Sequence, residues 1–243
     1  MNAGLFITGT DTGVGKTHVT AALLAELRRR GVRAAAFKPI ACGAGGRHDA
    51  EIYASIMGHE QPLDLINPIY LRRPLAPSVA AWLEHKRIDL RRIRECYRRL
   101  LSAYSVVLVE GAGGLMVPIR DNYFVADLAR SLKLPLLVVA RLGLGTINHS
   151  LLTVRQARAN GLTVRGIVLN DTVGGKRNQA AITNVKTVPE LCETPLLGVM
   201  PNGTKSRASA ARQICDRLFG RARSGAWAQG AGGKNRVRNS TGS

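Results

Sequence analysis

The sequence of 243 residues contains no apolar run near the ~20 residues that a membrane-spanning helix needs, and its longest runs, such as residues 134–140, are far shorter. It also begins without the basic segment and cleavable apolar stretch of a secretory leader. Cysteine is scarce: the 4 residues lie far apart with no C-x-x-C pair, which indicates neither a zinc site nor a redox dithiol. These absences predict a cytoplasmic protein with reduced thiols and no membrane partner.

Acidic side chains are also few. The chain has 16 Asp and Glu against 35 Lys and Arg, a formal net charge of +19, which is typical of proteins that bind nucleic acid or anionic surfaces. The basic residues are nevertheless spread along the chain, and the densest run, residues 87–99, carries apolar side chains at helical spacing. Two interpretations stay open, a solvated arginine-rich surface that also attracts anionic substrates and a dedicated nucleic-acid site. We favour the first and do not expect a nucleic-acid partner.

The rest of the composition is that of a folded globular protein. Apolar residues make up 45% of the chain, which also has 26 Gly and only 10 Pro, so it is neither collagenous nor disordered. The length fits one large domain, which we place at residues 1–220. Residues 221–243 contain five basic residues, no acidic ones and many Gly, Ser and Asn. That composition predicts a disordered tail.

Short apolar segments of strand length recur at residues 5–8, 33–37, 106–109, 136–140, 164–169 and 196–200. Several contain no polar residue, as strands buried on both faces do. Helical patterns lie between them, notably at residues 17–30, 87–101 and 148–159. The alternation predicts an α/β fold with a doubly wound, mostly parallel sheet flanked by helices.

A phosphate-binding loop follows the first predicted strand. Residues 9–17 read Gly-Thr-Asp-Thr-Gly-Val-Gly-Lys-Thr, and a predicted helix begins where they end. Small residues let consecutive backbone N–H groups wrap phosphates, Lys16 reaches the outer phosphates, and the Thr17 hydroxyl can bind Mg²⁺. Thr10 stands where the common pattern has its first Gly. The strand, loop and helix together predict a P-loop NTPase-like fold.

Charged side chains near the ends of predicted strands are candidates for the same site. Glu110 follows the strand at residues 106–109, Asp49 lies in a Gly-rich loop after the second strand, and Lys38 closes that strand. Ligands in such sheets bind at the carboxyl ends of the strands, where carboxylates suit Mg²⁺ and an ammonium can stabilise a transferring phosphoryl group. We favour Glu110 as a site residue. For Asp49 and Lys38 an ordinary surface position is an equally good interpretation.

Asn170 and Asp171 end the strand at residues 164–169. An Asn amide can both donate to and accept from an adenine edge. An ordinary turn after a strand, in which Asn and Asp are common, explains the pair equally well.

In combination, these motifs closely resemble the dethiobiotin synthetase family. The matching stretches are GTDTGVGKT (9–17), KPIACG (38–43), PLAPS (74–78), VEGAGG (109–114), LGTINH (144–149), GLTVRGIVLND (161–171) and PLLG (195–198). The phosphate loop and VEGAGG occur in other relatives of that family. The TDT loop combined with the KP, INH and 161–171 motifs is much more specific.

The resemblance implies an ATP- and Mg²⁺-dependent enzyme of biotin biosynthesis that converts 7,8-diaminononanoate and CO2 to dethiobiotin. One amine is carboxylated to a carbamate, the carbamate takes the γ-phosphoryl group of ATP, and the second amine closes the ureido ring. The resemblance also implies a homodimer, in which residues 145–149 open a helix and help to bind the substrate carboxylate of the neighbouring subunit.

Site residues follow from the same resemblance by motif position. Mg²⁺ would be held by Thr17, Asp49 and Glu110. Catalytic roles would fall to Lys38, Lys16 and Thr12. The nucleotide and its metal would be bound by Gly13, Val14, Gly15, Lys16, Thr17, His18, Asp49, Glu110, Gly111, Ala112, Gly113, Asn170, Asp171, Pro201, Asn202 and Gly203. The diamine would contact Thr12, Lys38, Cys42, Pro77, Ser78, Gly145 and Asn148.

The chain departs from the family pattern in three places. Cys42 stands where Ser or Thr is usual, so a weak S–H replaces a good hydroxyl. Residues 201–203 read Pro-Asn-Gly, where many relatives have Pro followed by an aromatic residue. Residues 172–193 and those after 203 match poorly. For His149 we expect a positional role, because this chemistry does not need an imidazole.

The alternative function is a partitioning or septum-positioning switch ATPase, for which the positive charge would serve DNA or membrane binding. Such ATPases usually carry an extra lysine early in the phosphate loop, where this chain has Thr10-Asp11-Thr12. We therefore favour the synthetase.

Overall fold

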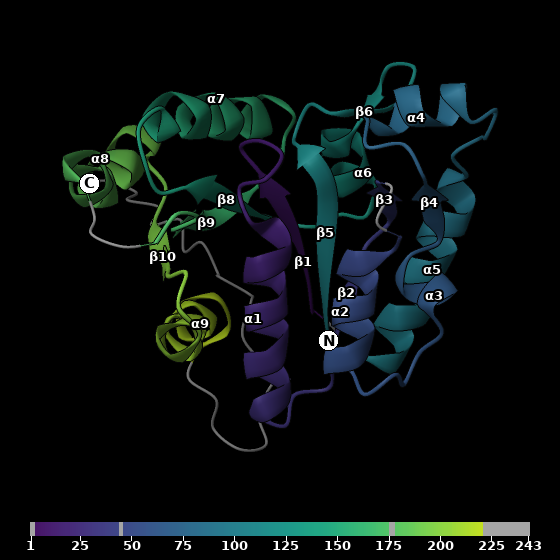
Figure 1. Cartoon of the computed structure of the whole chain (residues 1–243), viewed down its shortest axis with the longest axis horizontal. Helices are drawn as coiled ribbons and strands as arrows, with labels where there is room; N and C mark the ends of the chain where they lie inside the picture. The colour runs from purple at the N-terminus through teal and green to yellow at the C-terminus, as the bar shows by residue number, and fades with distance from the viewer. Residues whose placement is uncertain (1–2, 44–45, 175–177, 221–243) are drawn as a thin grey trace, which may run out of the picture.

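A 6-stranded sheet forms the centre of the protein. The computed structural model describes residues 3–43, 46–174 and 178–220. The strands of the sheet run in the order β10-β9-β8-β1-β5-β2, and every pairing is parallel. They are β1 (Ala3–Gly9), β2 (Ala34–Phe37), β5 (Val106–Gly114), β8 (Leu136–Arg141), β9 (Val164–Asn170) and β10 (Leu196–Met200). The predicted α/β fold is confirmed (Figure 1).

Helices flank this sheet and connect its strands (Figure 1). α1 (Lys16–Arg29) follows β1 and packs against both α2 (His48–Ile56) and α9 (Thr204–Phe219). The other helices are α3 (Leu63–Ile66), α4 (Pro77–Leu83), α5 (Leu90–Ala103), α6 (Val125–Ser131), α7 (Thr146–Ala159) and α8 (Gln179–Cys192). Two small sheets pair β3 (Ile40–Cys42) with β4 (Ile69–Leu71) and β6 (Pro118–Arg120) with β7 (Tyr123–Phe124).

The central strands form because apolar side chains cover both of their faces. All of β2 is buried, and so are residues 106–109 of β5, as in sheets that helices cover on both sides. β1 lies between β8 and β5, so the loop that follows it leaves the carboxyl edge near the middle of the sheet. That edge is where open α/β sheets bind their ligands.

Two predicted positions of acidic residues are wrong. β5 continues to Gly114, so Glu110 lies inside the strand and does not follow it. The glycines stay in the strand because Gly114 pairs with Gly9 of β1 after a register shift. Asp49 lies in the first turn of α2, not in a Gly-rich loop.

Two helix starts also differ from the prediction. α5 begins at Leu90, because the Asp89 carboxylate caps it by accepting hydrogen bonds from the backbone N–H groups of Arg91 and Arg92. α7 begins at Thr146, with Gly145 in a left-handed conformation at its N-cap. α5 is amphipathic as predicted, with Ile93, Cys96, Tyr97 and Leu100 buried and Arg91, Arg92, Arg98 and Arg99 exposed.

The predicted tail at residues 221–243 lies outside the described residues, so the domain boundary at residue 220 stays a prediction. Within the three described ranges, no helix has the length and apolar character needed to cross a bilayer. The four cysteines at positions 42, 96, 192 and 215 form no disulfide.

Candidate active site

The phosphate loop between β1 and α1 folds around the Lys16 side chain. Gly13 and Gly15 have φ angles of 73° and 88°, the left-handed region that favours glycine. Lys16 Nζ donates a hydrogen bond of 3.0 Å to the Asp11 carbonyl. A Cβ at Gly9 would lie 2.9 Å from Nζ, so glycine makes room for the ammonium. The loop therefore holds the lysine over the place where phosphates bind in such loops.

Glu110 is the centre of a buried network of hydrogen bonds. Its side chain is 1% exposed, and Oε1 accepts from Thr17 Oγ1 at 3.0 Å and from Lys38 Nζ at 2.6 Å. Lys38 Nζ also lies 2.6 Å from Asp49 Oδ2. Two carboxylates thus share one ammonium beside the first turn of α1. The structure brings together Thr17, Lys38, Asp49 and Glu110, which come from four separate segments of the chain.

These contacts set the charge states of the site. Burial would lower the pKa of Lys38, but the carboxylates of Glu110 and Asp49 outweigh it and raise that pKa. Burial would raise the pKa of Asp49, but Lys38 holds it below its ordinary value. Burial lowers the pKa of Lys16 to about 8, helped by Lys38 and opposed by Glu110. Lys38 is therefore a fixed cation, whereas the Lys16 ammonium gives up its proton more readily than a free lysine does.

The oxygen atoms at this point suit a divalent cation. Thr17 offers a hydroxyl, Asp49 and Glu110 offer carboxylates, and the phosphate loop would bring phosphate oxygens to the same place. Hard oxygen donors are what Mg²⁺ prefers, and it keeps only one or two protein carboxylates in phosphate sites. No group of three or more His, Cys, Asp or Glu side chains that could hold a metal occurs in the described ranges. The donor set fits Mg²⁺ bound together with phosphate.

The end of β5 approaches the phosphate loop closely. A Cβ at Gly113 would lie 3.4 Å from Thr12 Oγ1 and 2.7 Å from a Val117 methyl carbon, and one at Gly111 would lie 2.9 Å from the Phe6 ring. Ala112 lies between these two glycines. Thr12 itself is exposed, and its backbone N–H donates to the Asp11 carboxylate at 2.7 Å. The Thr12 side chain is therefore free to contact a substrate.

Cys42 lies on β3, the small strand that follows Lys38. It is half-buried and packs partly against the core. Burial raises the pKa of its thiol to about 11, although the Lys38 charge opposes the rise. Pro77, the first residue of α4, is buried and Ser78 is half-buried. α4 packs against β3, so these residues lie in one part of the structure.

Asn170 supports the phosphate loop. Its Nδ2 donates a hydrogen bond of 2.9 Å to the Val14 carbonyl, while Oδ1 is buried without a partner among the described residues. The Asp171 carboxylate accepts hydrogen bonds from the backbone N–H groups of Gly174 at 2.8 Å and Val173 at 3.3 Å. Asp171 therefore closes the turn after β9, whereas Asn170 keeps one free acceptor beside the loop.

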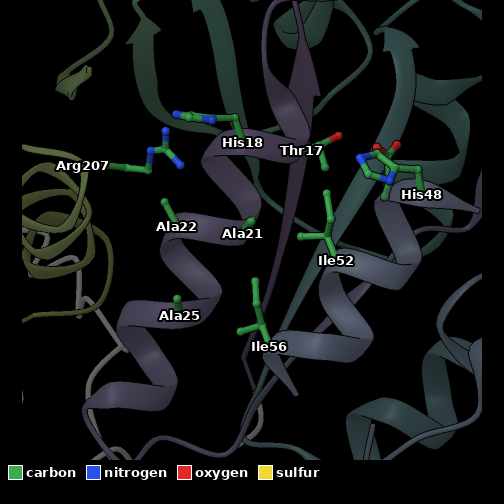
Figure 2. A pocket seen from close by; sticks show the side chains of 10 residues that line it. Thr17, His18, Ala21, Ala22, Ala25, His48, Ile52, Ile56 and Arg207 are labelled. Atoms are coloured by element: carbon green, nitrogen blue, oxygen red, sulfur yellow. The ribbon is translucent and has the colours of Figure 1, made fainter. Parts of the chain in front are cut away.

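A cavity of about 550 Å³ opens between α1, α2 and α9, at the phosphate-loop end of α1 (Figure 2). Its lining includes Thr17 and Asp49, and His18 and Arg207 approach each other across one side. Burial, together with Arg207, lowers the pKa of His18, while a hydrogen bond with the Pro201 backbone opposes the shift. Arg207 Nη2 donates to the Asn202 carbonyl at 2.9 Å. Residues 201–203, which precede α9, thus lie beside the start of α1.

Gly145 and Asn148 stand apart from this network. Both are exposed at the start of α7, and His149 is exposed as well. No hydrogen bond in the described part of the chain joins them to the phosphate loop, which contacts β8 through the Thr10 N–H bond to the Val139 carbonyl and the 3.9 Å ion pair of Asp11 with Arg141.

Tyr53 and Arg207 are two site residues that the sequence did not reveal. Tyr53 is fully buried and its hydroxyl donates to Glu110 Oε2, and desolvation together with Glu110 raises its pKa well above the ordinary value. It follows Asp49 by four residues, so the two share one face of α2. A helix predicted over this segment would have revealed it. Arg207 offered no signal, because its contact with the start of α1 depends on the packing of α9.

Comparison with known proteins agrees with this geometry. A family model described as an AAA domain matches residues 3–210. An ATP-dependent dethiobiotin synthetase of Thermodesulfovibrio yellowstonii is 39% identical over 214 residues, covering 83% of this chain and 89% of that protein. One from Anaeromyxobacter dehalogenans is 44% identical over 200 residues, covering 82% and 89%. A third, from Methanococcus vannielii, is 40% identical over 190 residues, covering 78% and 84%.

The chain belongs to the dethiobiotin synthetase family. The resemblance predicted from the motifs, and with it an ATP-dependent ligase, is confirmed.

Solved structures show a likeness of fold alone. The MinC:MinD cell-division complex of Aquifex aeolicus contains a chain with a TM-score of 0.60 at 15% identity, covering 90% of this chain and 97% of that one. A ParA family ATPase of Chlorobium tepidum has a TM-score of 0.54 at 10% identity, covering 90% and 91%. The switch ATPases therefore share the architecture, and the sequence relationship is to the synthetases.

Proposed function

We propose that the protein catalyses the ATP- and Mg²⁺-dependent ring closure of 7,8-diaminononanoate with CO2, giving dethiobiotin, ADP and phosphate. The observation that carries the proposal is the Lys38 ammonium, held between Asp49 and Glu110 beside Thr17 at the carboxyl edge of the sheet. Family membership supplies the reaction, and this network supplies the charges that the reaction needs.

The reaction proceeds in three steps. One amine of the diamine adds to CO2 and loses a proton, which gives a carbamate. A carbamate oxygen attacks the γ-phosphorus of ATP and ADP leaves, which gives a carbamic-phosphoric anhydride. The second amine then attacks the carbamoyl carbon, and phosphate leaves as the ureido ring closes. Each step places reacting groups beside one another, and such positioning is a large part of catalysis.

The two lysines stabilise the negative charge that moves during these steps. Lys16, folded over the loop, would contact the outer phosphates, and their charge would keep its ammonium protonated. Lys38 would face the carbamate and the transferring phosphoryl group. Thr17, Asp49 and Glu110 would hold Mg²⁺, which neutralises charge on the triphosphate. Thr12 and Cys42 would line the diamine side.

Asn170 has one side-chain atom that can accept a hydrogen bond from the adenine. Its Nδ2 is used by Val14, so the buried Oδ1 is the acceptor left for the exocyclic amine of the base. Residues 201–203, packed beside His18, would form the neighbouring wall of the nucleotide site. Asp171 would act there only through the turn that it closes.

Exposed apolar side chains support a homodimer. Leu144, just before α7, is 89% exposed, Leu152 on α7 is 60% exposed, and Trp82 on α4 is 74% exposed. Both helices lie along the upper edge of the view in Figure 1. A second copy would remove these side chains from water. It would also bring the exposed Gly145 and Asn148 to the neighbouring subunit, where the helix N-terminus suits a substrate carboxylate.

Phosphate release from ATP should depend on both the diamine and bicarbonate, because the phosphoryl acceptor is made from them and water is a poor substitute in an organised site. The measurement is phosphate release with each component omitted in turn, together with mass-spectrometric detection of dethiobiotin. Phosphate release that does not change with the diamine but increases with DNA or lipid vesicles would contradict this function and indicate a switch ATPase.

Cys42→Ser should lower the KM for the diamine by about 2- to 12-fold with little change in the KM for ATP, since one added hydrogen bond is worth about 0.5–1.5 kcal/mol. With a pKa of about 11, the wild-type thiol should react slowly with iodoacetamide at pH 7. Its rate should rise about tenfold for each pH unit as the thiolate forms, and bound diamine should protect it.

The control for this experiment is Cys42→Ala, which keeps the residue small and removes the polar atom. If Cys42 only packs as an apolar residue, Ser will lower the thermal midpoint and leave the KM unchanged, and the diamine will not protect the thiol. Alkylation is measured by mass spectrometry on the peptide that contains residue 42. The other cysteines, Cys96, Cys192 and Cys215, are buried, so their peptides report any unfolding.

A further inference from the structure

Tyr53 holds the oxygen of Glu110 that the other residues of the site do not use. Its ring is fully buried on α2, and its hydroxyl donates to Oε2. Lys38 and Thr17 both bind Oε1 of the same carboxylate. The two oxygens of Glu110 therefore have different donors: Oε1 binds the Thr17 hydroxyl and the Lys38 ammonium, and Oε2 binds the Tyr53 phenol.

A carboxylate held at one oxygen only can rotate about its last bond. Three donors on two oxygens fix the plane of the Glu110 carboxylate, and a hydrogen bond to a charged acceptor is among the stronger ones in proteins. Glu110 is 1% exposed, so water has little access to replace a lost donor. Removing the phenol hydroxyl would leave Oε2 without its partner and would free the carboxylate to turn.

Tyr53 also links α2 to β5 independently of Lys38. Asp49 lies one helical turn before Tyr53, so both point from the same face of α2. The Asp49 contact with Glu110 passes through the Lys38 ammonium, whereas Tyr53 touches Glu110 directly. If Lys38 moves to a substrate carbamate, the phenol still holds the Glu110 carboxylate against α2, the helix that carries Asp49.

We propose that Tyr53 is a positioning residue for the divalent cation: by binding Oε2, it presents Oε1 of Glu110, together with Asp49, toward the phosphate loop. This inference rests on the proposed function only in assigning Glu110 to Mg²⁺. It does not depend on the identity of the substrate that accepts the phosphoryl group.

The test is Tyr53→Phe, which removes one oxygen atom and keeps the ring. Mn²⁺ serves as the probe, and its free concentration is read by electron paramagnetic resonance in the presence of ADP and the protein. The dissociation constant for Mn²⁺ should rise roughly 10- to 100-fold, the usual cost of losing a residue that orients a metal ligand. ADP binding without metal should change less than twofold. The Mg²⁺ concentration for half-maximal activity should rise much more than kcat falls.

Tyr97→Phe is the matched control. Tyr97 is a buried tyrosine on α5 whose ring lies 6.2 Å from that of Phe37, and its hydroxyl bonds to no carboxylate within the described ranges. Tyr97→Phe should bind Mn²⁺ as the wild type does. Equal Mn²⁺ affinity of Tyr53→Phe and wild type, or equal losses in both variants, overturns the proposal.

A second measurement tests the proposal without Tyr53→Phe, in case that variant does not fold. 3-Fluorotyrosine placed only at position 53 keeps the hydroxyl, and its ¹⁹F resonance should shift when Mg²⁺ is added with ADP; an unmoved resonance overturns the proposal. The two claims remain separable. Wild-type protein that binds Mn²⁺ through this network but does not convert the diamine would contradict the proposed function and leave the role of Tyr53 intact.

Discussion

Replacing Lys38 by Ala should lower kcat by roughly 10²-fold or more, with a smaller effect on the KM for ATP. The loss of one preorganised donor to charge that develops in a transition state has an effect of this order. Lys38 is 5% exposed and has both carboxylate partners at 2.6 Å, so its ammonium is fixed before substrate arrives. The measurement is steady-state kinetics at saturating Mg²⁺ and bicarbonate. Normal turnover in this variant would remove Lys38 from the catalytic residues.

The same substitution should affect stability in a way that identifies its cause. Without the ammonium, Asp49 and Glu110 face each other as unscreened carboxylates, and removal of one partner from a buried ion pair typically costs about 3–5 kcal/mol. Mg²⁺ should therefore raise the thermal midpoint of Lys38→Ala more than that of the wild type, because the cation replaces the lost charge. Lys86→Ala is the control: the exposed Lys86 ammonium pairs with Glu84 at 2.8 Å, and a pair that water reaches contributes little.

The phosphate loop and the strand cores are predictable because their signals are local. Residues 9–17 follow a predicted strand, consist mostly of small residues and lead into a predicted helix. This local combination indicates a phosphate-binding loop. The strands predicted at 136–140 and 196–200 lie nearly at their observed bounds. The first is a buried parallel strand, which reads as a continuous apolar run, and the second is an edge strand whose residues are also apolar.

The rest of the site depends on contacts between distant segments, which no local pattern records. The predicted β5 is too short, since Gly-Ala-Gly-Gly has poor strand propensity and extends the strand only by pairing with Gly9. β3, which carries Cys42, has three residues and exists through its pairing with β4. The apolar pattern of α2 is short, so the sequence alone puts Asp49 in a loop and gives no sign of Tyr53.

Asn170 illustrates a further limit of prediction from residue type. Its amide suggests a contact with adenine, yet Nδ2 binds the Val14 carbonyl, 156 residues away in the chain. A strand-end asparagine that also builds the phosphate loop makes the geometry of that loop depend on β9. This dependence leads to a second large expected effect.

Gly15→Ala should weaken ATP binding by at least about 30-fold. The φ angle of Gly15 is 88°, and a left-handed conformation costs a residue with a Cβ roughly 1–2 kcal/mol. The added Cβ would also lie 1.9 Å from Asn170 Nδ2, so the amide must leave Val14 and a buried acceptor loses its partner, at about 1–3 kcal/mol. The free loop would relax to escape these costs, which come to about 2 kcal/mol or more. ATP binding would then have to restore the strained loop, and each 1.4 kcal/mol spent in this way is about tenfold in affinity. Isothermal titration with ADP measures the loss directly.

Gly31→Ala separates the strain from the collision. Gly31, just after α1, has a φ of 76°, but a Cβ added there would meet nothing within 4 Å, so this variant should lose stability by only about 1–2 kcal/mol and bind nucleotide normally. In a double-mutant cycle, Gly15→Ala should cost less affinity in the Asn170→Ala background than in the wild type, because the atom that the methyl group meets is already gone. Losses that simply add in the double variant would show that Asn170 does not shape the loop through Gly15. A positive coupling would place the β9 asparagine in the construction of the phosphate site, since strain at residue 15 remains in both backgrounds and cancels from the cycle.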